Sequence, residues 1–356
     1  MKKFKIGSKK VGLDFPSYFI ADIAANHDGD LNKAIDLIYS CAEAGANAAK
    51  FQHFSAETIV SDIGFRNLNR KYLSHQKKWK KSVFEVYKDA SINLEWTSKL
   101  KEACKKAKID FLSTPYSYYL ADHLFKHIPA YKIGSGDVNW LEFISYIAKK
   151  NKPLLVATGA TNINEVNKLI KLIYKINKKI VLMQCNTNYT GDKNNLKYIN
   201  LNVLKTYKKR FPNIILGLSD HTFGHSSVLG AISLGARVIE KHYTLDNNLN
   251  GPDHYFSMNP NTWQEMIKRS RELESCLGTD IKKVELNERS TVIIQRRSAH
   301  AKRDIYKKKK ITKNDIEFLR PSPKNSFKPD EIKLIIGKIT KKFIPKGSTI
   351  FYKDVF

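Results

Sequence analysis

The sequence predicts a (β/α)8 TIM barrel followed by a small C-terminal domain rich in short strands. Three observations support this fold. Short apolar runs alternate with segments of helical periodicity, which is the pattern of a parallel sheet whose crossovers are helices. Eight such runs occur before residue 277, and an open sheet rarely supplies eight equal repeats. After residue 277 the alternation stops, which indicates a separate C-terminal part.

The expected strands are apolar runs of strand length, each bounded by polar turns. They span residues 18–24, 48–54, 110–116, 130–136, 153–159, 179–186, 214–219 and 237–243. Residues 30–44 are typical of the helices between them, because Leu31, Leu37 and Cys41 fall on one helical face before Gly45 ends the segment. Residues 55–95 interrupt the alternation, and a loop that long after a strand usually carries a lid or an interface.

The chain is expected to contain three parts: a barrel over residues 1–277, a linker over 278–296 and a C-terminal domain over 297–356. The linker is charged and has no long apolar run. The C-terminal part combines short strand candidates with turns such as Pro345-Lys-Gly347. A domain of this size is marginally stable alone, so we expect it to rest on another surface.

Composition excludes several classes of protein. A hydrophobic content of 42% excludes a disordered chain. The net charge of +28 suggests nucleic acid, but the lysines are scattered and form no basic stripe, so we expect no nucleic-acid partner. The N-terminus lacks a signal core, and no apolar run approaches the roughly 20 residues of a membrane span. With widely spaced cysteines as well, we expect a cytoplasmic protein without a membrane partner.

Two histidines, His221 and His242, each close an apolar run that is expected to be a buried strand. A histidine at the last residue of such a strand points into the mouth of a barrel. A lone histidine is often a core residue, but Ser219, Asp220 and Glu240 crowd the same stations. Two imidazoles from neighbouring strand ends can hold one divalent cation and leave its other positions open. The pair therefore predicts a metal site.

Polar residues recur at the other strand ends and imply a shared polar cavity. They include Asp22, Gln52, Thr114, Ser135, Thr158, Thr187 and Tyr189. Lys50 and Lys132 are the main charge carriers, and a buried ammonium needs a compensating anion. One hypothesis is a Schiff-base nucleophile, as in barrel aldolases. The favoured hypothesis is a cradle for a small molecule that carries phosphate and carboxylate.

Several motifs resemble those of the sialic acid synthase (N-acetylneuraminate synthase) family, in family order along nearly the whole chain. They are Asn26-His-Asp-Gly29, Lys50-Phe-Gln52, Ser113-Thr-Pro115, Lys132-Ile-Gly-Ser-Gly136, Ser219-Asp-His-Thr222, Glu240-Lys-His242 and Gly251-Pro-Asp-His254. The C-terminal part, from Arg297-Ser through Arg320-Pro321 to Ile336-Gly-Lys338, resembles the family's antifreeze-like (SAF) domain. The resemblance implies a cytoplasmic homodimer in which this domain caps the barrel of the partner.

The resemblance also implies a reaction. Phosphoenolpyruvate would condense with the open-chain aldehyde of N-acetylmannosamine or a related N-acyl hexosamine, phosphate would be lost, and a nine-carbon 2-keto acid would form. His221 and His242 match the family's ligands for a divalent metal, with Mn²⁺ expected and Mg²⁺ or Co²⁺ as alternatives. The metal would polarise the aldehyde.

Site roles follow by position in the matching motifs and strand ends. The expected catalytic residues are Asp22, Lys50, Lys132, Glu240 and Asp253. The expected substrate-binding residues are Gln52, Thr114, Ser135, Thr158, Thr187, Tyr189, Ser219 and Arg320. Lys50, Lys132 and the hydroxyls of residues 114, 135 and 219 are assigned to phosphoenolpyruvate. Arg320 is assigned to the sugar's N-acyl group, in the site of the partner subunit.

Three departures from the family pattern lie near the substrates. Asp22 stands where the family usually has glutamate. Ala157 stands where the family often has a serine that helps to hold phosphate, and neighbouring Thr158 is expected to compensate for that serine. The turn after Arg320 is longer and stiffer than the family's turn. They leave the acceptor open, so a legionaminate or pseudaminate synthase acting on a diacetamido trideoxy hexose is an alternative. A Schiff-base barrel aldolase is a further one. A binding protein for nucleic acid or ice is disfavoured by the scattered lysines and the missing secretion signal.

Overall fold

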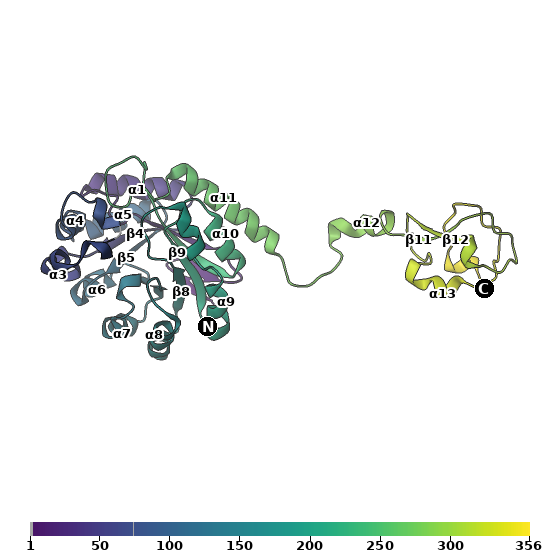
Figure 1. Cartoon of the computed structure of the whole chain (residues 1–356), viewed down its shortest axis with the longest axis horizontal. Helices are drawn as coiled ribbons and strands as arrows, with labels where there is room; N and C mark the ends of the chain where they lie inside the picture. Colours follow the sequence, from purple (N-terminus) through teal and green to yellow (C-terminus); the bar gives the residue numbers. More distant parts are fainter. Residues whose placement is uncertain (1–2, 74) are drawn as a thin grey trace. The chain divides into compact units, whose positions relative to one another are not determined.

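The computed structural model describes residues 3–73 and 75–356 and divides the chain into two compact units (Figure 1). The first unit ends at Gly278, and the second spans Thr279–Phe356. Within residues 3–73 and 75–356, every helix falls short of the length or the apolar character that a membrane crossing requires.

The first unit is a closed barrel of parallel strands, which confirms the predicted TIM barrel. Its strands are β3 (Tyr18–Asp22), β4 (Ala48–His53), β5 (Asp110–Pro115), β6 (Tyr131–Ile133), β7 (Leu154–Ala157), β8 (Ile180–Cys185), β9 (Ile215–Asp220) and β10 (Ala236–His242). They pair in chain order, and β10 closes the barrel against β3. Each of the eight expected strands therefore has a counterpart in the structure.

Helices surround this barrel, as Figure 1 shows. They are α1 (Leu31–Glu43), α5 (Trp96–Lys106), α6 (Tyr118–Phe125), α7 (Leu141–Lys149), α8 (Ile163–Ile176), α9 (Val203–Arg210), α10 (Ser226–Ser233) and α11 (Pro260–Leu277). The helix expected over residues 30–44 is α1, whose N-cap Asp30 accepts hydrogen bonds from two backbone amides. Gly45 follows its end with a φ of +96°, a conformation that glycine adopts without strain.

Alternation along the strands separates two layers of side chains. Ile20, Leu112 and Leu155 belong to a small core inside the barrel, whereas Phe19 and Phe111 belong to the large core beneath the helices. A hairpin of β1 (Lys3–Ile6) and β2 (Lys9–Gly12) adds its apolar side chains to the inner core and closes the N-terminal end of the barrel. The sequence analysis did not predict this hairpin.

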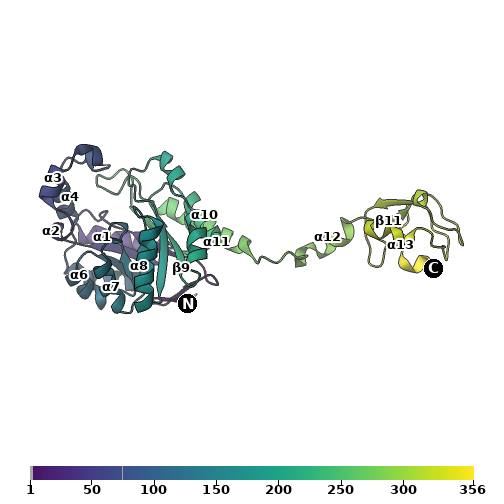
Figure 2. The same ribbon diagram turned by 60° about the horizontal axis from the view of Figure 1, so that its bottom comes forward.

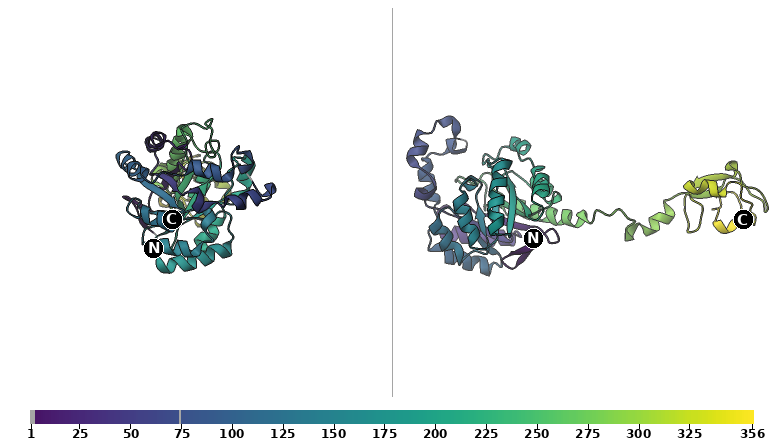
Figure 3. Two further views of the ribbon diagram at one scale, coloured as in Figure 1. Left: turned by 90° about the vertical axis from the view of Figure 1, so that its left-hand side faces the viewer. Right: turned by 90° about the horizontal axis from the view of Figure 1, so that it is seen from below.

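The insertion after β4 folds into short helical segments. They are α2 (Ala56–Ile59), α3 (Asp62–Asn67), η1 (Arg70–Tyr72), η2 (His75–Lys78) and α4 (Val83–Ala90). In Figures 2 and 3 this segment stands at the rim of the barrel opposite the N-terminal hairpin. That rim is where the carboxyl ends of the strands lie, so the insertion is placed beside the mouth of the barrel.

The second unit begins with η5 (Leu286–Glu288) and α12 (Arg289–Ile294) and continues into a compact β-rich fold. An antiparallel pair, β11 (Ser298–Ala301) and β12 (Ile316–Leu319), packs with the short helix α13 (Ile332–Ile335). Its own apolar core includes Ile305, Phe327 and Ile350. The remaining short 3-10 segments are η3 (Ser135–Asp137), η4 (Lys193–Tyr198), η6 (Lys313–Asp315), η7 (Pro329–Glu331) and η8 (Tyr352–Asp354).

Candidate active site

A buried ionic cluster occupies the mouth of the barrel. Lys50 Nζ lies 2.7 Å from Asp22 Oδ2 and 3.9 Å from Glu240 Oε1, and Lys132 Nζ donates to the same Glu240 oxygen at 2.5 Å. All four side chains are buried. They converge because each lies two residues after a residue of the inner core, so each points into the barrel. The structure thus brings together four of the five predicted catalytic residues.

The ion pair between Asp22 and Lys50 keeps both groups charged. Burial alone raises the pKa of Asp22, but the ammonium of Lys50 outweighs burial and leaves that pKa lowered. Burial likewise opposes the charge of Lys50, yet Asp22 and Glu240 leave the pKa of its ammonium raised. An ammonium group has three N–H donors, so Lys50 can hold its carboxylate and still donate to a bound anion.

Hydroxyl and amide groups surround this cluster. Ser219 Oγ donates to Glu240 Oε1 at 3.1 Å, while the second oxygen of Glu240 is buried and has no hydrogen-bond partner among the described residues. Thr114 follows Leu112 on the inward side of β5 and is buried. Ser135 Oγ accepts a hydrogen bond from Gly159 N at 2.9 Å. A buried carboxylate oxygen without a partner is costly unless a ligand or water reaches it.

His221 and His242 lie side by side, with ring centroids 5.3 Å apart. His221 Nδ1 lies 3.0 Å from the carbonyl oxygen of Asn186, an arrangement that leaves Nε2 available as a ligand. Burial lowers the pKa of His221, but Cys185 and that carbonyl outweigh burial and leave the pKa raised. His242 has its pKa lowered to about 3, chiefly by burial, so its ring is neutral at physiological pH.

This donor set fits a divalent cation with open coordination positions. His242 Nδ1 is buried and, within the part of the chain that the structure describes, has no hydrogen-bond partner. Asp253 Oδ2 lies 3.8 Å from this nitrogen, and Asp22 Oδ2 lies 3.6 Å from His242 Nε2. Across the described residues, no three or more His, Cys, Asp or Glu side chains form a ready-made metal cage. Two imidazoles with a neighbouring carboxylate suit Mn²⁺ or a similar ion, with water or substrate completing the shell.

A cavity of about 390 Å³ opens at this mouth. Predicted site residues that line it are Gln52, Ser135, Thr187, Tyr189, His242 and Asp253. Gln52 Nε2 lies 3.4 Å from Asp22 Oδ2, which links the cavity wall to the ionic cluster. The ring of Tyr189 lies 4.3 Å from the ring of His221, so it covers the histidine pair. Phe256, which sequence analysis did not single out, packs beside Tyr189, with its ring 5.7 Å from that of Tyr189 and 4.9 Å from that of His242.

The outer part of this cavity has an aromatic wall that the sequence analysis missed. The wall consists of Phe54, Trp79, Tyr87 and Tyr116. The ring of Phe54 lies 5.4 Å from that of Tyr87 and 5.8 Å from that of Tyr116. Asp137 lines the same cavity, and burial raises the pKa of its carboxyl to about 6. The available signals were the aromatic content of the insertion, which carries Trp79 and Tyr87, and the positions of Phe54 and Tyr116 directly after β4 and β5.

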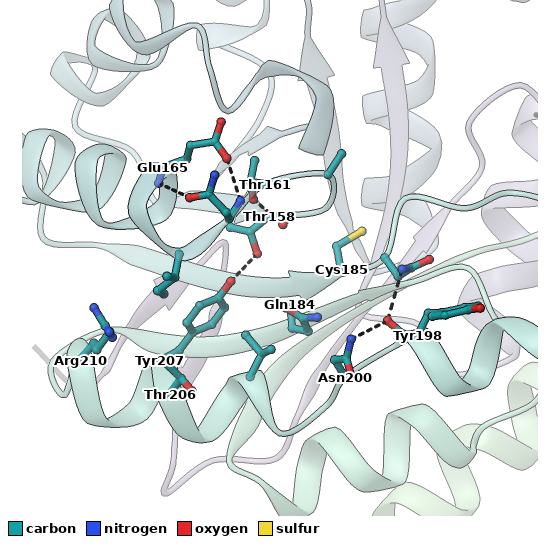
Figure 4. Close-up of a pocket in the computed structure, with 15 residues that line it drawn as sticks. Thr158, Thr161, Glu165, Gln184, Cys185, Tyr198, Asn200, Thr206, Tyr207 and Arg210 are labelled. Carbon is teal, nitrogen blue, oxygen red and sulfur yellow. Dashed lines mark hydrogen bonds between the residues drawn. The ribbon is translucent and has the colours of Figure 1, made fainter. Parts of the chain in front are cut away.

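The structure does not bring Thr158 together with the other predicted residues. Its hydroxyl turns to the outer side of β7, where it lies 2.9 Å from the carbonyl of Met183 and 3.0 Å from the hydroxyl of Tyr207. Figure 4 shows this bond in a separate cavity of about 720 Å³, which Cys185 and Arg210 also line. Ala157 faces inward instead, so Thr158 does not supply a hydroxyl to the mouth.

Arg320 belongs to the second unit, where it follows directly after β12 and is exposed. The assignment of Arg320 to the acceptor sugar of a partner's site therefore stays a prediction.

Comparisons with known proteins agree with this architecture. The model of the NeuB family matches residues 37–282, and the model of the SAF domain matches residues 296–355. The N,N'-diacetyllegionaminic acid synthase of Legionella pneumophila is 31% identical over 98% of this chain and 97% of its own length. The pseudaminic acid synthase of Campylobacter jejuni is 30% identical over 95% of this chain and 96% of its own.

A solved structure is similar over most of the chain. The N-acetylneuraminic acid synthetase of Leptospira borgpetersenii, in complex with citrate, superposes with a TM-score of 0.71 at 26% identity, covering 82% of this chain and 95% of that chain. Since the family model spans well over half of the sequence and the SAF model spans most of the remainder, the chain belongs to the NeuB family of phosphoenolpyruvate-dependent nonulosonic acid synthases, with a C-terminal SAF domain.

Proposed function

We propose that this protein condenses phosphoenolpyruvate with the open-chain aldehyde of N-acetylmannosamine or a related N-acyl hexosamine. The enzymes of its family use phosphoenolpyruvate and an N-acyl sugar, and they generally use a divalent metal. One observation carries the proposal for this chain: two paired ammonium groups and two adjacent imidazoles meet at one end of the barrel. The two ammonium groups suit an anionic enol ester, and the two imidazoles suit a cation that activates a carbonyl.

Lys50 and Lys132 would bind the phosphate and carboxylate of phosphoenolpyruvate, with Thr114, Ser135 and Ser219 as hydroxyl donors. Asp22 and Glu240 hold the two ammonium groups in fixed positions before the substrate arrives. Preorganised charges in a buried site bind an anion with little reorganisation. This arrangement supports a role for both lysines in orienting the enol ester.

The cation would be held by His221 and His242, with Mn²⁺ as the expected ion and Mg²⁺ or Co²⁺ as alternatives. When bound, a cation there supplies Lewis-acid polarisation of the aldehyde oxygen. Asp22 and Gln52, which contact each other beside His242, would orient the aldehyde end of the sugar. Asp253 and Tyr189 would face the sugar and the water that reacts later.

In the proposed reaction, C3 of phosphoenolpyruvate forms a bond to the aldehyde carbon, and the aldehyde oxygen gains a proton. Water adds to the oxocarbenium centre at C2, and the bond between C2 and the phosphate oxygen then breaks. The products are inorganic phosphate and a 2-keto acid. The protein's contribution is to orient the two reactants and to exclude other nucleophiles.

A Schiff-base aldolase is less well supported. An imine-forming lysine must lose its proton, which requires a lowered pKa. The pKa of Lys50 is raised, and Lys132 is bonded to Glu240. Borohydride treatment in the presence of pyruvate or phosphoenolpyruvate is therefore expected to trap no lysine adduct, as checked by mass spectrometry of the intact chain.

A diacetamido trideoxy hexose is the second candidate acceptor. The relatives named as diacetyllegionaminic and pseudaminic acid synthases cover almost the whole chain. The aromatic wall of Phe54, Trp79, Tyr87 and Tyr116 supports an acceptor with apolar substituents, because methyl and acetyl groups pack on ring faces. A trideoxy hexose carries a methyl group where other hexoses carry a hydroxymethyl group, and this methyl group would pack on the aromatic wall.

A homodimer in which the SAF domain caps the partner's barrel remains part of the proposal. The second unit leaves Leu334 58% exposed and Phe343 46% exposed, which supports contact with another surface. In such a dimer Arg320 would reach the N-acyl group of the acceptor bound to the partner.

The proposal is tested by incubating purified full-length protein with Mn²⁺, phosphoenolpyruvate and each of three sugars. These are N-acetylmannosamine, a 2,4-diacetamido trideoxy mannose and a 2,4-diacetamido trideoxy altrose. Phosphate release and product mass are measured, with a chelated sample as control. We expect one sugar to support metal-dependent phosphate release, and absence of release with all three would contradict the proposal.

A further inference from the structure

A second buried ion pair lies directly behind the two histidines. Lys241 Nζ lies 2.5 Å from Asp220 Oδ2, and both side chains are only 1% exposed. Asp220 and Lys241 are register partners on β9 and β10, and each immediately precedes one of the histidines. Because successive side chains point to opposite faces, the ion pair lies toward the helices while the imidazoles face the mouth.

The carboxylate of Asp220 is bound on every side by groups close to His221. Its Oδ2 accepts from the hydroxyls of Thr222 at 2.9 Å and Ser227 at 2.5 Å, and its Oδ1 accepts from Thr222 N at 3.2 Å. Lys241 Nζ donates to the carbonyl oxygen of Thr222 at 2.6 Å. The residues on both sides of His221 are thus tied to the strand that carries His242 and to the start of α10.

The ion pair also lies at the last registered position between β9 and β10 before the two histidines. The registered pairs between β9 and β10 end at Asp220 and Lys241, and in the described chain no further pair joins these strands at His221 and His242. The backbone of His242 is also held on its other side, where it is in register with Asp22 on β3. Between the two histidines, whose ring centroids lie 5.3 Å apart, the ion pair lies at the last registered position that joins β9 to β10. A buried ion pair contributes little net stability compared with apolar residues of similar volume, so stability alone does not explain it.

We propose that the Asp220–Lys241 ion pair is a positioning device that fixes the separation and orientation of His221 and His242, and thereby sets the affinity of the site for its divalent cation. The inference rests on the metal site of the proposed function. The side chains of Asp220 and Lys241 point away from the mouth, where the cation and the substrates would bind, so they would act only through the histidines. Outer partners that orient metal ligands typically change metal affinity by about 10- to 100-fold when removed.

The test measures Mn²⁺ binding to metal-free full-length protein by electron paramagnetic resonance, without substrates. The double variant Asp220→Asn/Lys241→Met removes the ion pair while it keeps the charge balanced and the volume similar. We expect its Kd for Mn²⁺ to rise by about 10- to 100-fold while the protein remains folded. Thr222→Val, which removes one hydroxyl donor to Asp220, is expected to raise the Kd severalfold.

Thr97→Val is the matched control, because Thr97 is also buried behind the barrel wall and its hydroxyl joins His53 and His123. It is expected to lower the melting temperature and leave the Kd for Mn²⁺ unchanged. An unchanged Kd in the folded double variant overturns the proposal. If the double variant does not fold, an unchanged Kd in Thr222→Val overturns it instead. Wild-type protein that binds no Mn²⁺ would overturn both this inference and the metal assignment on which it rests.

Discussion

The barrel mouth and the C-terminal unit both bury carboxylates, but they satisfy them differently. In the C-terminal unit, Asp315 accepts from Arg303 Nε at 2.6 Å through one oxygen and from the amide and hydroxyl of Thr312 through the other. At the mouth, Glu240 Oε2 and His242 Nδ1 have no partner among the residues described. Among the described residues, every buried side-chain nitrogen or oxygen atom that lacks a hydrogen-bond partner belongs to the barrel unit. Complete satisfaction indicates a structural role, whereas incomplete satisfaction at a cavity indicates room for ligands.

The largest expected effect follows from removing an imidazole at the mouth. His221→Ala or His242→Ala should lower kcat by roughly a hundred- to a thousandfold, because carbonyl activation is lost together with the cation. The measurements are phosphate release and bound Mn²⁺ after gel filtration. His53→Gln is the matched control, since His53 is equally buried but bonds to Ser113 and Thr97 behind the barrel wall. Full activity of His242→Ala after chelation would refute the metal assignment.

The next effect tests the anion cradle. Lys132→Met leaves Glu240 without its nearest cation and removes a donor, so KM for phosphoenolpyruvate should rise by roughly 10- to 100-fold. The KM for the sugar should change much less. Lys150→Met serves as control, because Lys150 bonds to Asp122 on the outside of the barrel. Equal increases in both KM values would indicate general disruption of the mouth and not a role in binding phosphoenolpyruvate.

In the C-terminal unit, where the buried carboxylate is fully hydrogen-bonded, Asp315→Asn should destabilise the fold by about 1.5 to 3 kcal/mol. Burial raises the pKa of Asp315, but its bonds to Thr312 and Arg303 outweigh burial and leave the pKa lowered. Because the pKa of Asp315 is lower in the folded than in the unfolded chain, its carboxylate stabilises the folded unit fully at pH values above the unfolded pKa of about 3.9. That stabilisation is lost as the pH falls toward the folded pKa.

Urea unfolding of the full chain at neutral and at acidic pH measures this effect. The wild-type protein should lose stability on acidification more steeply than Asp315→Asn. Phosphate release at neutral pH, measured in the absence of urea, separates a stability effect from an effect on the mouth. Parallel pH dependence in the two proteins would show that Asp315 is not the source of the acid sensitivity.

The same comparison explains how far the sequence could predict the structure. The strand ends were predictable because apolar runs mark the strands, and inward residues follow an inward neighbour by two positions, as Lys132 follows Ala130. The same rule predicts the orientation of Thr158, because Leu155 and Ala157 take the inward positions and Thr158 therefore faces outward. The hairpin at residues 3–12 was missed because its lysines obscure the alternation of Ile6 and Val11.

The aromatic wall could be predicted only in part from local pattern. Phe54 and Tyr116 directly follow the paired strands β4 and β5, whereas Trp79 and Tyr87 come from the insertion, and only its fold against the mouth brings them to the other two. Nothing in the spacing of these residues distinguishes a cavity wall from a core stripe.

A substitution in the aromatic wall has the smallest expected effect on activity, and it tests most directly which part of the acceptor sugar the mouth of the barrel contacts. Tyr87→Leu keeps an apolar side chain but removes the ring face beside Phe54, so KM for the sugar should rise about 3- to 10-fold, in line with the energy of aromatic contacts. KM for phosphoenolpyruvate and the Kd for Mn²⁺ should stay unchanged, because the ionic cluster and the histidines do not contact this ring. A larger loss for diacetamido sugars than for N-acetylmannosamine would assign the wall to the apolar substituents. An equal loss for all sugars would assign it to the shared N-acyl group, and no loss would show that the acceptor does not reach the insertion.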